Sequence, residues 1–383
     1  MQRLNTNQNC EPVKLAFLSA GLGNISRGFE TSCSTWFDVI ENRRDIDARL
    51  FSGRKYKTST KILNCPRNGH VATILRYARL INDGCRLEQI TFSLGFLIQL
   101  ISYRPDIIWI QEATLGNMLL KFRKIFGFKY KLVFCDGAPV GYWYAKRFDY
   151  LIFLHQHAMN EAIYEGVDNR KCRVIPHLSL FPINPLTKSD ARNKLNINKE
   201  KFVIICVAAW NKHHKRIDYL VNEVALLNSK EVTLLLCGQP EKDSLFLKNT
   251  ADKLAIDVRW HTLSQEDLSI AYLASDLFVL PSLNEALGAV LIEAGAHGLP
   301  VICHKHQAGK FIFGENYPGL TDLSKEGKLA EKILDIQNTM NIKKEGFETE
   351  RIIKKKFNRN KLTEDFVKFI EHIYENERPV NYL

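Results

Sequence analysis

Residues 277–304 read LFVLPSLNEALGAVLIEAGAHGLPVICH, and this stretch decides the expected fold. An apolar run, LFVLP, leads into a polar loop, a helical pattern that ends at Gly298, and a second apolar run, PVICH. Short apolar runs bounded by Pro, Asn or Gly are typical of strands buried on both faces, and glycine commonly ends a helix. The stretch therefore predicts a strand, a helix and a second, parallel strand.

The same alternation runs along most of the 383 residues. Strands are predicted at 13–19, 106–110, 131–135 and 150–154, and in a second series at 202–209, 232–237, 277–281 and 300–304. Helical patterns lie between them, including a buried helix at 90–101, an amphipathic helix at 216–227 and a final helix at 362–375. Strands that alternate with helices favour parallel sheets covered by helices.

The two series of strands are separated by residues 175–195, which carry three prolines and form the expected linker. We predict an α/β protein with two Rossmann-like domains that face each other across a cleft, where such folds bind ligands. The expected domains are residues 1–180 and 181–360. Residues 361–383 would form a C-terminal helix that packs back on the first domain.

Composition narrows the function classes. Nine cysteines without a C-x-x-C pair, and an N-terminus that lacks the apolar core of a signal peptide, predict a cytoplasmic protein with reduced thiols. The net charge of +11 calls for an acidic partner. The chain contains no zinc-finger, helix-turn-helix or RNA-binding pattern, so nucleic acid is not the expected partner. A sugar nucleotide and an anionic membrane surface both fit this charge.

Two acids, Glu285 and Glu293, lie eight positions apart around the start of the predicted helix. Eight residues span ~12 Å at helical rise, about the distance from a sugar to the ribose of a nucleotide. The backbone N–H groups of Ala286, Leu287 and Gly288 would lie between the acids, at the helix end that attracts a diphosphate. The alternative is an ordinary amphipathic helix whose acids are merely solvated.

The segment PSLNEALGAVLIEAGAHGLPVI (281–302) resembles the signature of the retaining family-4, or group 1, glycosyltransferases. Their pattern places P-S before a pair of glutamates eight positions apart and E-A-x-A-x-G-x-P-V-I at its end. The resemblance implies a GT-B fold whose C-terminal domain holds a nucleotide-sugar donor. It also implies that Glu285 contacts the transferred hexose and Glu293 the ribose hydroxyls.

A second part of the resemblance is the loop NKHHKRIDYL (211–220), which follows the strand at 202–209. Lys215 falls at the family's lysine, which grips the donor diphosphate, and Arg216 replaces the glycine that usually follows. Lys212 and Arg216 are the candidates for the second basic contact. The alternative is an exposed basic loop with no ligand.

In the first domain the residues Gly21, Gly23 and Gly28 do not form the G-x-G-x-x-G fingerprint of a dinucleotide site. The resemblance implies instead a glycine-rich loop that faces the donor phosphates, with Arg27 as an anion contact or, alternatively, in solvent. Asp136 stands where the family often has a catalytic histidine, so it either acts on the acceptor or simply ends a strand. His155 and His177 are further candidates, for which structural roles are favoured.

Neither a metal nor another cofactor is expected. The triplet Asp45-Ile46-Asp47 has the D-x-D form of a metal motif from a different glycosyltransferase fold, but it lies early in the first domain and is interpreted as surface charge. The apolar and basic segment 117–131 either lays a helix on an anionic membrane, at the cytoplasmic face, or packs Met118, Leu119, Phe122 and Ile125 into the core; the core is favoured.

Together these features predict a retaining hexosyltransferase. It would move a hexose from a nucleotide diphosphate sugar to a hydroxyl of a glycan or lipid-linked acceptor, in the synthesis of a cell-envelope polysaccharide or glycoconjugate. The alternatives are a sugar phosphorylase or a nucleotide-sugar epimerase on the same scaffold, and a non-catalytic subunit that binds a sugar nucleotide.

Overall fold

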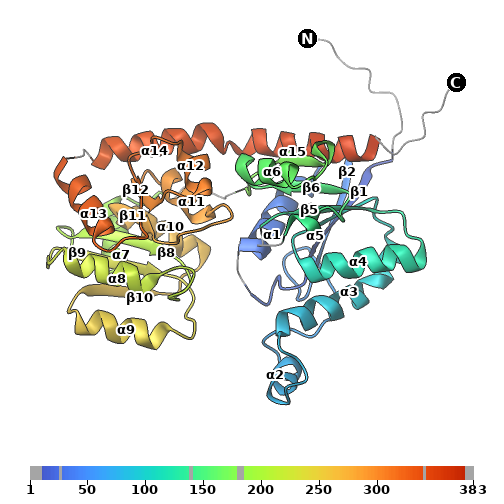
Figure 1. Cartoon of the computed structure of the whole chain (residues 1–383), viewed down its shortest axis with the longest axis horizontal. Helices are drawn as coiled ribbons and strands as arrows, with labels where there is room; N and C mark the ends of the chain where they lie inside the picture. Colours follow the sequence, from blue (N-terminus) through green and yellow to red (C-terminus); the bar gives the residue numbers. More distant parts are fainter. Residues whose placement is uncertain (1–10, 26–27, 138–140, 179–184, 340–341, 376–383) are drawn as a thin grey trace, which may run out of the picture. The chain divides into compact units, whose positions relative to one another are not determined.

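The structure is a computed structural model that describes residues 11–25, 28–137, 141–178, 185–339 and 342–375. Arg27, a predicted anion contact, lies outside these residues. The chain divides into two compact units. The first consists of residues up to Leu178 together with those from Arg359 onward, and the second ends at Asn358. Figure 1 shows both units, each built around one sheet.

The first unit contains a seven-stranded parallel sheet in the order β3-β2-β1-β4-β5-β6-β7. Its strands are β1 (Val13–Ser19), β2 (Ile46–Ser52), β3 (Thr60–Lys61), β4 (Ile107–Ile110), β5 (Lys131–Cys135), β6 (Tyr150–Phe153) and β7 (Cys172–Val174). Its helices are α1 (Gly28–Ile40), α2 (His70–Tyr77), α3 (Gly84–Ser102), α4 (Ala113–Phe126), α5 (Tyr142–Ala145), α6 (Gln156–Tyr164) and α15 (Arg359–Glu375), with a short 3₁₀ turn at Asn169–Lys171.

The second unit contains a six-stranded parallel sheet in the order β10-β9-β8-β11-β12-β13. Its strands are β8 (Phe202–Val207), β9 (Val232–Cys237), β10 (Asp257–His261), β11 (Leu277–Leu280), β12 (Val301–His304) and β13 (Leu320–Thr321). Its helices are α7 (Lys188–Lys194), α8 (Ile217–Leu226), α9 (Ser244–Lys253), α10 (Gln265–Ala274), α11 (Ala289–Ala296), α12 (Gln307–Phe313), α13 (Lys328–Thr339) and α14 (Ile342–Lys356). The predicted fold class, two α/β parallel-sheet domains, is confirmed.

Side-chain alternation along β1 explains how its sheet is covered. Phe17 points to one face, where its ring lies 6.1 Å from that of Phe366 on α15, and Phe366 in turn stacks on Trp36 of α1 at 4.5 Å. Ala16 and Leu18 point to the other face and join the core that contains Phe92 and Phe96 of α3. Successive residues of a strand face opposite sides, so helices are needed on both. The last helix of the chain thus supplies part of the first unit's core.

One expectation about α3 is wrong. The run 90–101 was expected to be a buried helix, but only one stripe, including Phe92, Phe96 and Leu100, is buried. The side chains of Leu94, Ile98 and Ile101 are 51, 70 and 63% exposed. Their spacing of four and three residues places them on one face of the helix, which has apolar residues on both sides.

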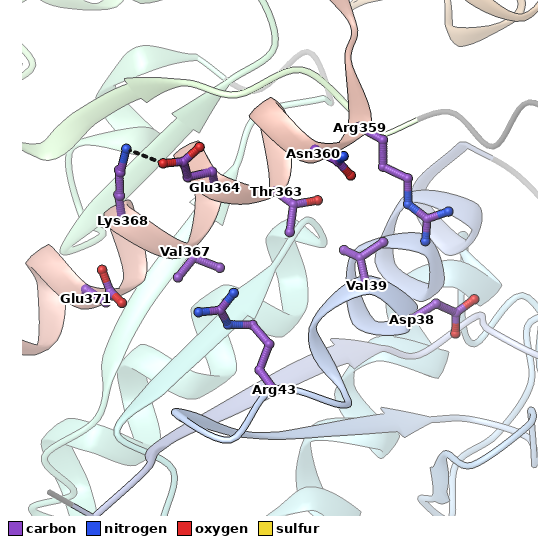
Figure 2. A pocket seen from close by; sticks show the side chains of 10 residues that line it. All are labelled: Asp38, Val39, Arg43, Arg359, Asn360, Thr363, Glu364, Val367, Lys368 and Glu371. Atoms are coloured by element: carbon purple, nitrogen blue, oxygen red, sulfur yellow. Dashed lines mark ion pairs between the residues drawn. The ribbon is translucent and has the colours of Figure 1, made fainter. Parts of the chain in front are cut away.

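A hollow of about 590 Å³ lies between the end of α1 and the start of α15, and Figure 2 shows the side chains around it. It is lined by Asp38, Val39, Arg43, Arg359, Asn360, Thr363, Glu364, Val367, Lys368 and Glu371. Most of these side chains are charged, and two of them, Lys368 and Glu364, form an ion pair of 2.7 Å. No residue predicted from the sequence to bind donor or acceptor lines it, and we do not regard it as the functional site. Within the described residues, no helix meets the length and hydropathy required to cross a bilayer.

Candidate functional site

The loop between β11 and α11 presents an uncapped helix end. Gly288 has φ +76°, which a residue with a side chain rarely adopts, and a Cβ there would lie 2.9 Å from Leu291 Cδ1. The helix begins directly after it, without a hydrogen bond from a capping side chain. Leu287 is buried, so only its backbone can face a ligand, whereas Ala286 is exposed. A tight, uncapped turn of this kind leaves N–H donors for an anion.

Lys215 and Glu285, seventy positions apart, form an ion pair of 2.5 Å in the second unit. Their side chains are only 19 and 9% exposed. Lys215 follows β8 and Glu285 follows β11, and these two strands are neighbours in the sheet. Because the carboxyl ends of parallel strands meet at one edge, the strand order itself brings the two charges together. The ammonium keeps further donors, and the carboxylate further lone pairs, for a ligand.

Glu293 lies inside α11 and is held from a neighbouring helix. The phenol of Tyr272, on α10, donates a hydrogen bond of 3.0 Å to Glu293 Oε2. The ring of His297 stacks on Tyr272 with centroids 4.9 Å apart, and its Nδ1 lies 2.8 Å from the Glu293 carbonyl oxygen. Burial raises the pKa of Glu293, and the Tyr272 hydrogen bond partly offsets this. The carboxylate is thus fixed in direction by a partner that the sequence did not indicate.

The other two basic candidates have different surroundings. Arg216 has φ +50°, and its guanidinium donates to the carbonyl oxygens of Pro281 at 3.1 Å and Leu323 at 2.6 Å. It therefore braces the loops after β8 and β11 against each other. Lys212 lies 4.1 Å above the ring of Phe246, an exposed cation–π contact that leaves its three N–H donors available. The Arg216 guanidinium is thus occupied by two carbonyl oxygens, whereas the role of Lys212 as the second cation stays a prediction.

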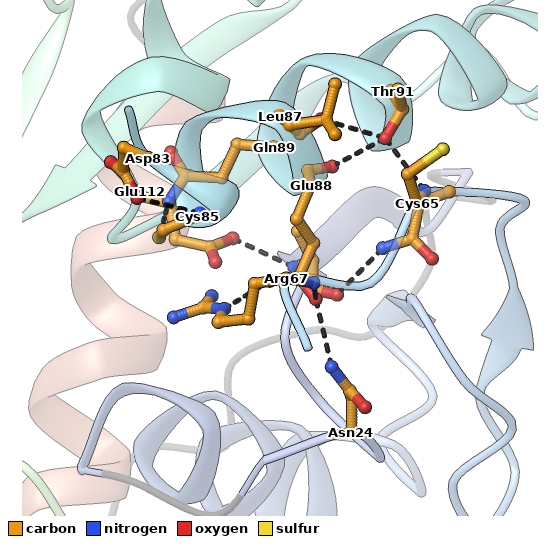
Figure 3. A network of polar contacts seen from close by, with 12 residues as sticks. Asn24, Cys65, Arg67, Asp83, Cys85, Leu87, Glu88, Gln89, Thr91 and Glu112 are labelled. Atoms are coloured by element: carbon orange, nitrogen blue, oxygen red, sulfur yellow. Dashed lines mark hydrogen bonds and ion pairs between the residues drawn. The ribbon is translucent and has the colours of Figure 1, made fainter. Parts of the chain in front are cut away.

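In the first unit, the glycine-rich loop after β1 is packed against charged side chains (Figure 3). A Cβ on Gly21 would lie 2.5 Å from Glu30 Oε1 and 3.1 Å from an Arg67 nitrogen, so a larger residue there would displace the ends of these side chains. Gly23 has φ +81°. The backbone thus favours glycine at Gly23, and the crowding at Gly21 comes from side-chain ends. Nothing in these contacts assigns them a donor phosphate, which stays a prediction.

The network in Figure 3 was not anticipated from the sequence. Glu88 is fully buried and accepts hydrogen bonds from Asn24 of the loop at 3.1 Å and from Arg67 Nε at 2.6 Å. Glu112 is 5% exposed and accepts the Ala20 N–H at 2.9 Å. The available signal was that Glu112 lies two residues after the end of a predicted strand. Glu88 and Arg67 carry no pattern that could have identified them.

Glu112 gives a prediction about pH. Burial raises its pKa from 4.5 to about 8. Between these values the folded protein binds more protons than the unfolded chain, so stability falls as the pH rises. Glu112→Gln keeps an acceptor for the Ala20 N–H but cannot titrate. We expect the fall in unfolding free energy between about pH 5 and pH 8 to shrink by roughly 2–4 kcal/mol, as measured by urea unfolding. Exposed Glu165→Gln is the control; equal slopes in both variants would contradict this expectation.

The remaining candidates of the first unit lie after β5 and β6. Burial raises the pKa of Asp136 to about 7, while its N–H donates to the Ile152 carbonyl at 2.8 Å. His155 accepts the Ala158 N–H at 3.1 Å and so begins α6, a structural role. Burial lowers the pKa of His177 to about 4, and its Nε2 lies 2.9 Å from Gln111 Nε2, which indicates a neutral structural ring. Asp136 stays a catalytic prediction.

The D-x-D triplet spans the start of β2. Asp45 pairs with Arg43 at 2.5 Å and Asp47 with Arg49 at 3.4 Å, so both carboxylates have arginine partners. Across the described ranges, no group of three or more His, Cys, Asp or Glu side chains is placed to hold a metal ion.

Part of the second unit matches a known protein family. Residues 187–345 match the family model described as glycosyl transferases group 1. The chain is 27% identical over 172 residues to TuaC of Bacillus subtilis strain 168, named for teichuronic acid biosynthesis, covering 44% of this chain and 41% of that one. The first curated relatives that it matches are spanned over only 53 and 30% of their length.

Solved structures resemble the whole chain. Sucrose-phosphate synthase from Thermosynechococcus elongatus gives a TM-score of 0.79 at 16% identity, with 95% of this chain and 100% of that chain covered. Anabaena HepE, solved in complex with UDP and glucose, gives a TM-score of 0.75 at 17% identity, with 94 and 100% covered. Such identities establish the fold alone. The second unit thus matches the group 1 glycosyltransferase model over residues 187–345, and the chain as a whole has the GT-B fold.

Proposed function

We propose that the protein is a retaining glycosyltransferase that moves a hexose from a nucleotide diphosphate sugar to a hydroxyl of a glycan or lipid-linked acceptor. The observation that carries the proposal is the 2.5 Å pair of Lys215 and Glu285 beside the uncapped start of α11, within the segment matched by the family model. One group is suited to a diphosphate and the other to sugar hydroxyls, and they lie in contact.

Each residue has a chemical role in this proposal. As the bond from the anomeric carbon to the diphosphate breaks, negative charge grows on the leaving oxygens. Lys215 and the N–H groups near Gly288 stabilise that charge, with Lys212 as a second cation. Glu285 accepts hydrogen bonds from the hexose, and Glu293 accepts those of the ribose diol. These assignments follow the resemblance and fit the contacts described above.

The proposed transfer is balanced without a covalent enzyme intermediate. The acceptor oxygen attacks the anomeric carbon on the face that the diphosphate leaves, and the departing phosphate oxygen takes the acceptor proton. Asp136 of the first unit stays a proposed catalytic residue, since its raised pKa suits the exchange of a proton with an acceptor hydroxyl. We propose that Lys215 and the helix end fulfil the role that a metal has elsewhere, so activity should persist with a chelator present.

We further propose that the reaction belongs to the synthesis of a cell-envelope polysaccharide or glycoconjugate in the cytoplasm. The name of TuaC, which refers to teichuronic acid biosynthesis, supports this setting. HepE was solved with UDP, which makes uridine diphosphate sugars the first donors to screen.

The test is a thermal-shift screen of nucleotide diphosphate sugars followed by an acceptor assay. A donor at a hundred times its Kd should stabilise the protein by about 2.7 kcal/mol. Glu293→Gln keeps an acceptor for Tyr272 but offers the ribose an amide, and it should weaken donor binding at least about tenfold. Exposed Glu231→Gln should bind as the wild type does. Wild-type affinity in Glu293→Gln would refute the ribose assignment.

Product analysis distinguishes a retaining glycosyltransferase from a sugar phosphorylase or a nucleotide-sugar epimerase with the same fold. Retention requires that the glycosidic bond formed has the anomeric configuration of the donor, which NMR of the product reports. Consumption of donor that depends on phosphate would instead indicate a phosphorylase. Conversion of the donor into a nucleotide sugar with an epimeric sugar, in the absence of any acceptor, would indicate an epimerase.

A further inference from the structure

The helix α2 carries an apolar face that the rest of the first unit leaves uncovered. Val71, Ile74, Tyr77 and, just beyond the helix, Leu80 are 54, 65, 93 and 72% exposed. Within this fully described helix, Ala72 alone is buried. Figure 1 shows α2 beyond the end of α3, away from the strands of its sheet. We call the side chains of Val71, Ile74, Tyr77 and Leu80 the α2 face.

A helix of eight residues with one buried side chain has few interactions that stabilise it. Isolated helices of that length are marginal in water, and helices in proteins are usually stabilised by burying an apolar face. Here the apolar residues recur at intervals of three, on the side that is exposed. The arrangement is typical of a helix whose apolar face is completed by something outside the unit.

The charges of the segment that carries the α2 face indicate what covers this face. Lys61, Arg76, Arg79 and Arg86 are exposed, and in the part of the chain that the structure describes none of them forms an ion pair. Between residues 61 and 87 the sequence contains a single acid, Asp83, whose carboxylate accepts the Cys85 N–H to begin α3. The segment that carries the α2 face is thus basic and nearly free of acids, and exposed apolar side chains on such a segment are complementary to a layer of anionic lipids.

We propose that the α2 face docks the protein on an anionic lipid surface, with its apolar side chains at the acyl boundary and these cations among the headgroups. The sequence offered the segment 117–131 for such a contact, although packing of that segment into the core was favoured. There Leu119 and Phe122 of α4 are buried and Met118 packs against the core, as predicted. The prediction that Ile125 is a core residue is wrong, because Ile125 is 69% exposed, and the neighbouring Phe126 is 56% exposed.

The segment that leads into α2 is linked to the glycine-rich loop. Arg67, three residues before α2, is bound to Glu88, which also accepts from Asn24 of that loop. A docked α2 would therefore hold this loop near the lipid headgroups. That the docking serves a lipid-linked acceptor rests on the proposed function, whereas the docking itself does not.

Flotation with vesicles tests the proposal without any catalysis. We expect the purified chain to float with phosphatidylcholine vesicles that contain a third of phosphatidylglycerol, and not with phosphatidylcholine alone. Ile74→Asp with Tyr77→Asp should weaken binding at least about tenfold. Arg76→Glu with Arg79→Glu should weaken it about fivefold for each cation removed, and high salt should do the same to the wild type.

The matched control is Ile125→Asp with Phe126→Asp, which changes two exposed apolar residues of α4. It should float as the wild type does. Circular dichroism should show native helix content in every variant, since all the altered side chains are exposed. Glu285→Gln should also float normally, so a failure of the proposed chemistry and a failure of docking are distinguishable.

Three results would overturn the proposal. The first is a wild type that does not float, or that floats equally with neutral vesicles. The second is loss of binding in the α4 variant but not in the α2 variant. The third is sedimentation of the wild type as a dimer that Ile74→Asp with Tyr77→Asp converts to monomer, which would assign the α2 face to a second copy of the chain.

Discussion

Lys215→Met is expected to lower kcat/KM for the nucleotide sugar by about a hundred- to a thousandfold. Its ammonium lies 2.5 Å from Glu285, next to the start of α11. If the proposed function is correct, it is the charge nearest to the leaving diphosphate, and loss of one such preorganised group typically has an effect of this size. The measurement is steady-state release of the nucleoside diphosphate with saturating acceptor.

A stability measurement must accompany this experiment. Removing one partner of a partly buried ion pair destabilises a protein because it leaves the other charge unpaired, so a loss of about 1–3 kcal/mol is expected in Lys215→Met. The assay temperature must therefore lie well below the variant's Tm. Lys248→Met is a matched control, because its ammonium also lies close to side chains of the second unit, 5.4 Å from the Trp210 ring. Normal turnover in folded Lys215→Met would contradict the assignment.

Glu223→Ala should lower the unfolding free energy by about 3–5 kcal/mol. Glu223 of α8 is 2% exposed and accepts three backbone N–H groups at the start of α13: Gly327 at 2.6 Å, and Leu329 and Ala330 at 2.9 Å each. Alanine would leave these buried donors without an acceptor at the positive end of a helix. Urea unfolding monitored by circular dichroism measures the change.

The comparison for Glu223 is Glu331→Ala on the same helix, α13. Glu331 is 67% exposed and pairs only with Lys328, so its loss should change stability by less than about 0.5 kcal/mol. Glu223→Gln retains one acceptor oxygen and should fall between the two variants. Equal stability of Glu223→Ala and Glu331→Ala would show that α13 does not depend on this carboxylate.

The strands that the sequence predicted are those with continuous apolar runs. The strands β8, β9, β11 and β12 were predicted for that reason, because burial on both faces requires such runs. The edge strand β10, DVRWH, was missed, since every one of its side chains is partly exposed and it has no apolar run. The strand β2 was missed because Asp47 and Arg49 interrupt it, and its first residues were interpreted only as a metal-like triplet.

The candidate site was predictable in composition but not in geometry. A family signature identified Glu285, Glu293 and Lys215. The contact between Lys215 and Glu285 depends on which strands are neighbours, and the order β8-β11 cannot be read from spacing along the chain. The inward direction of Arg216 depends on a backbone with positive φ, which is rare for arginine. Tyr272 belongs to a helix that no motif indicated.

The stacking of Phe366 on Trp36 has a consequence for biosynthesis. A ribosome releases residue 36 early and residue 366 only after every residue of the second unit. Until then the α1 side of the first sheet lacks its final helix, and the indole of Trp36 has no ring to cover it. The domain that is translated first is thus the one completed last. We expect a chaperone to bind its incomplete apolar surface mainly while the second domain is being synthesised.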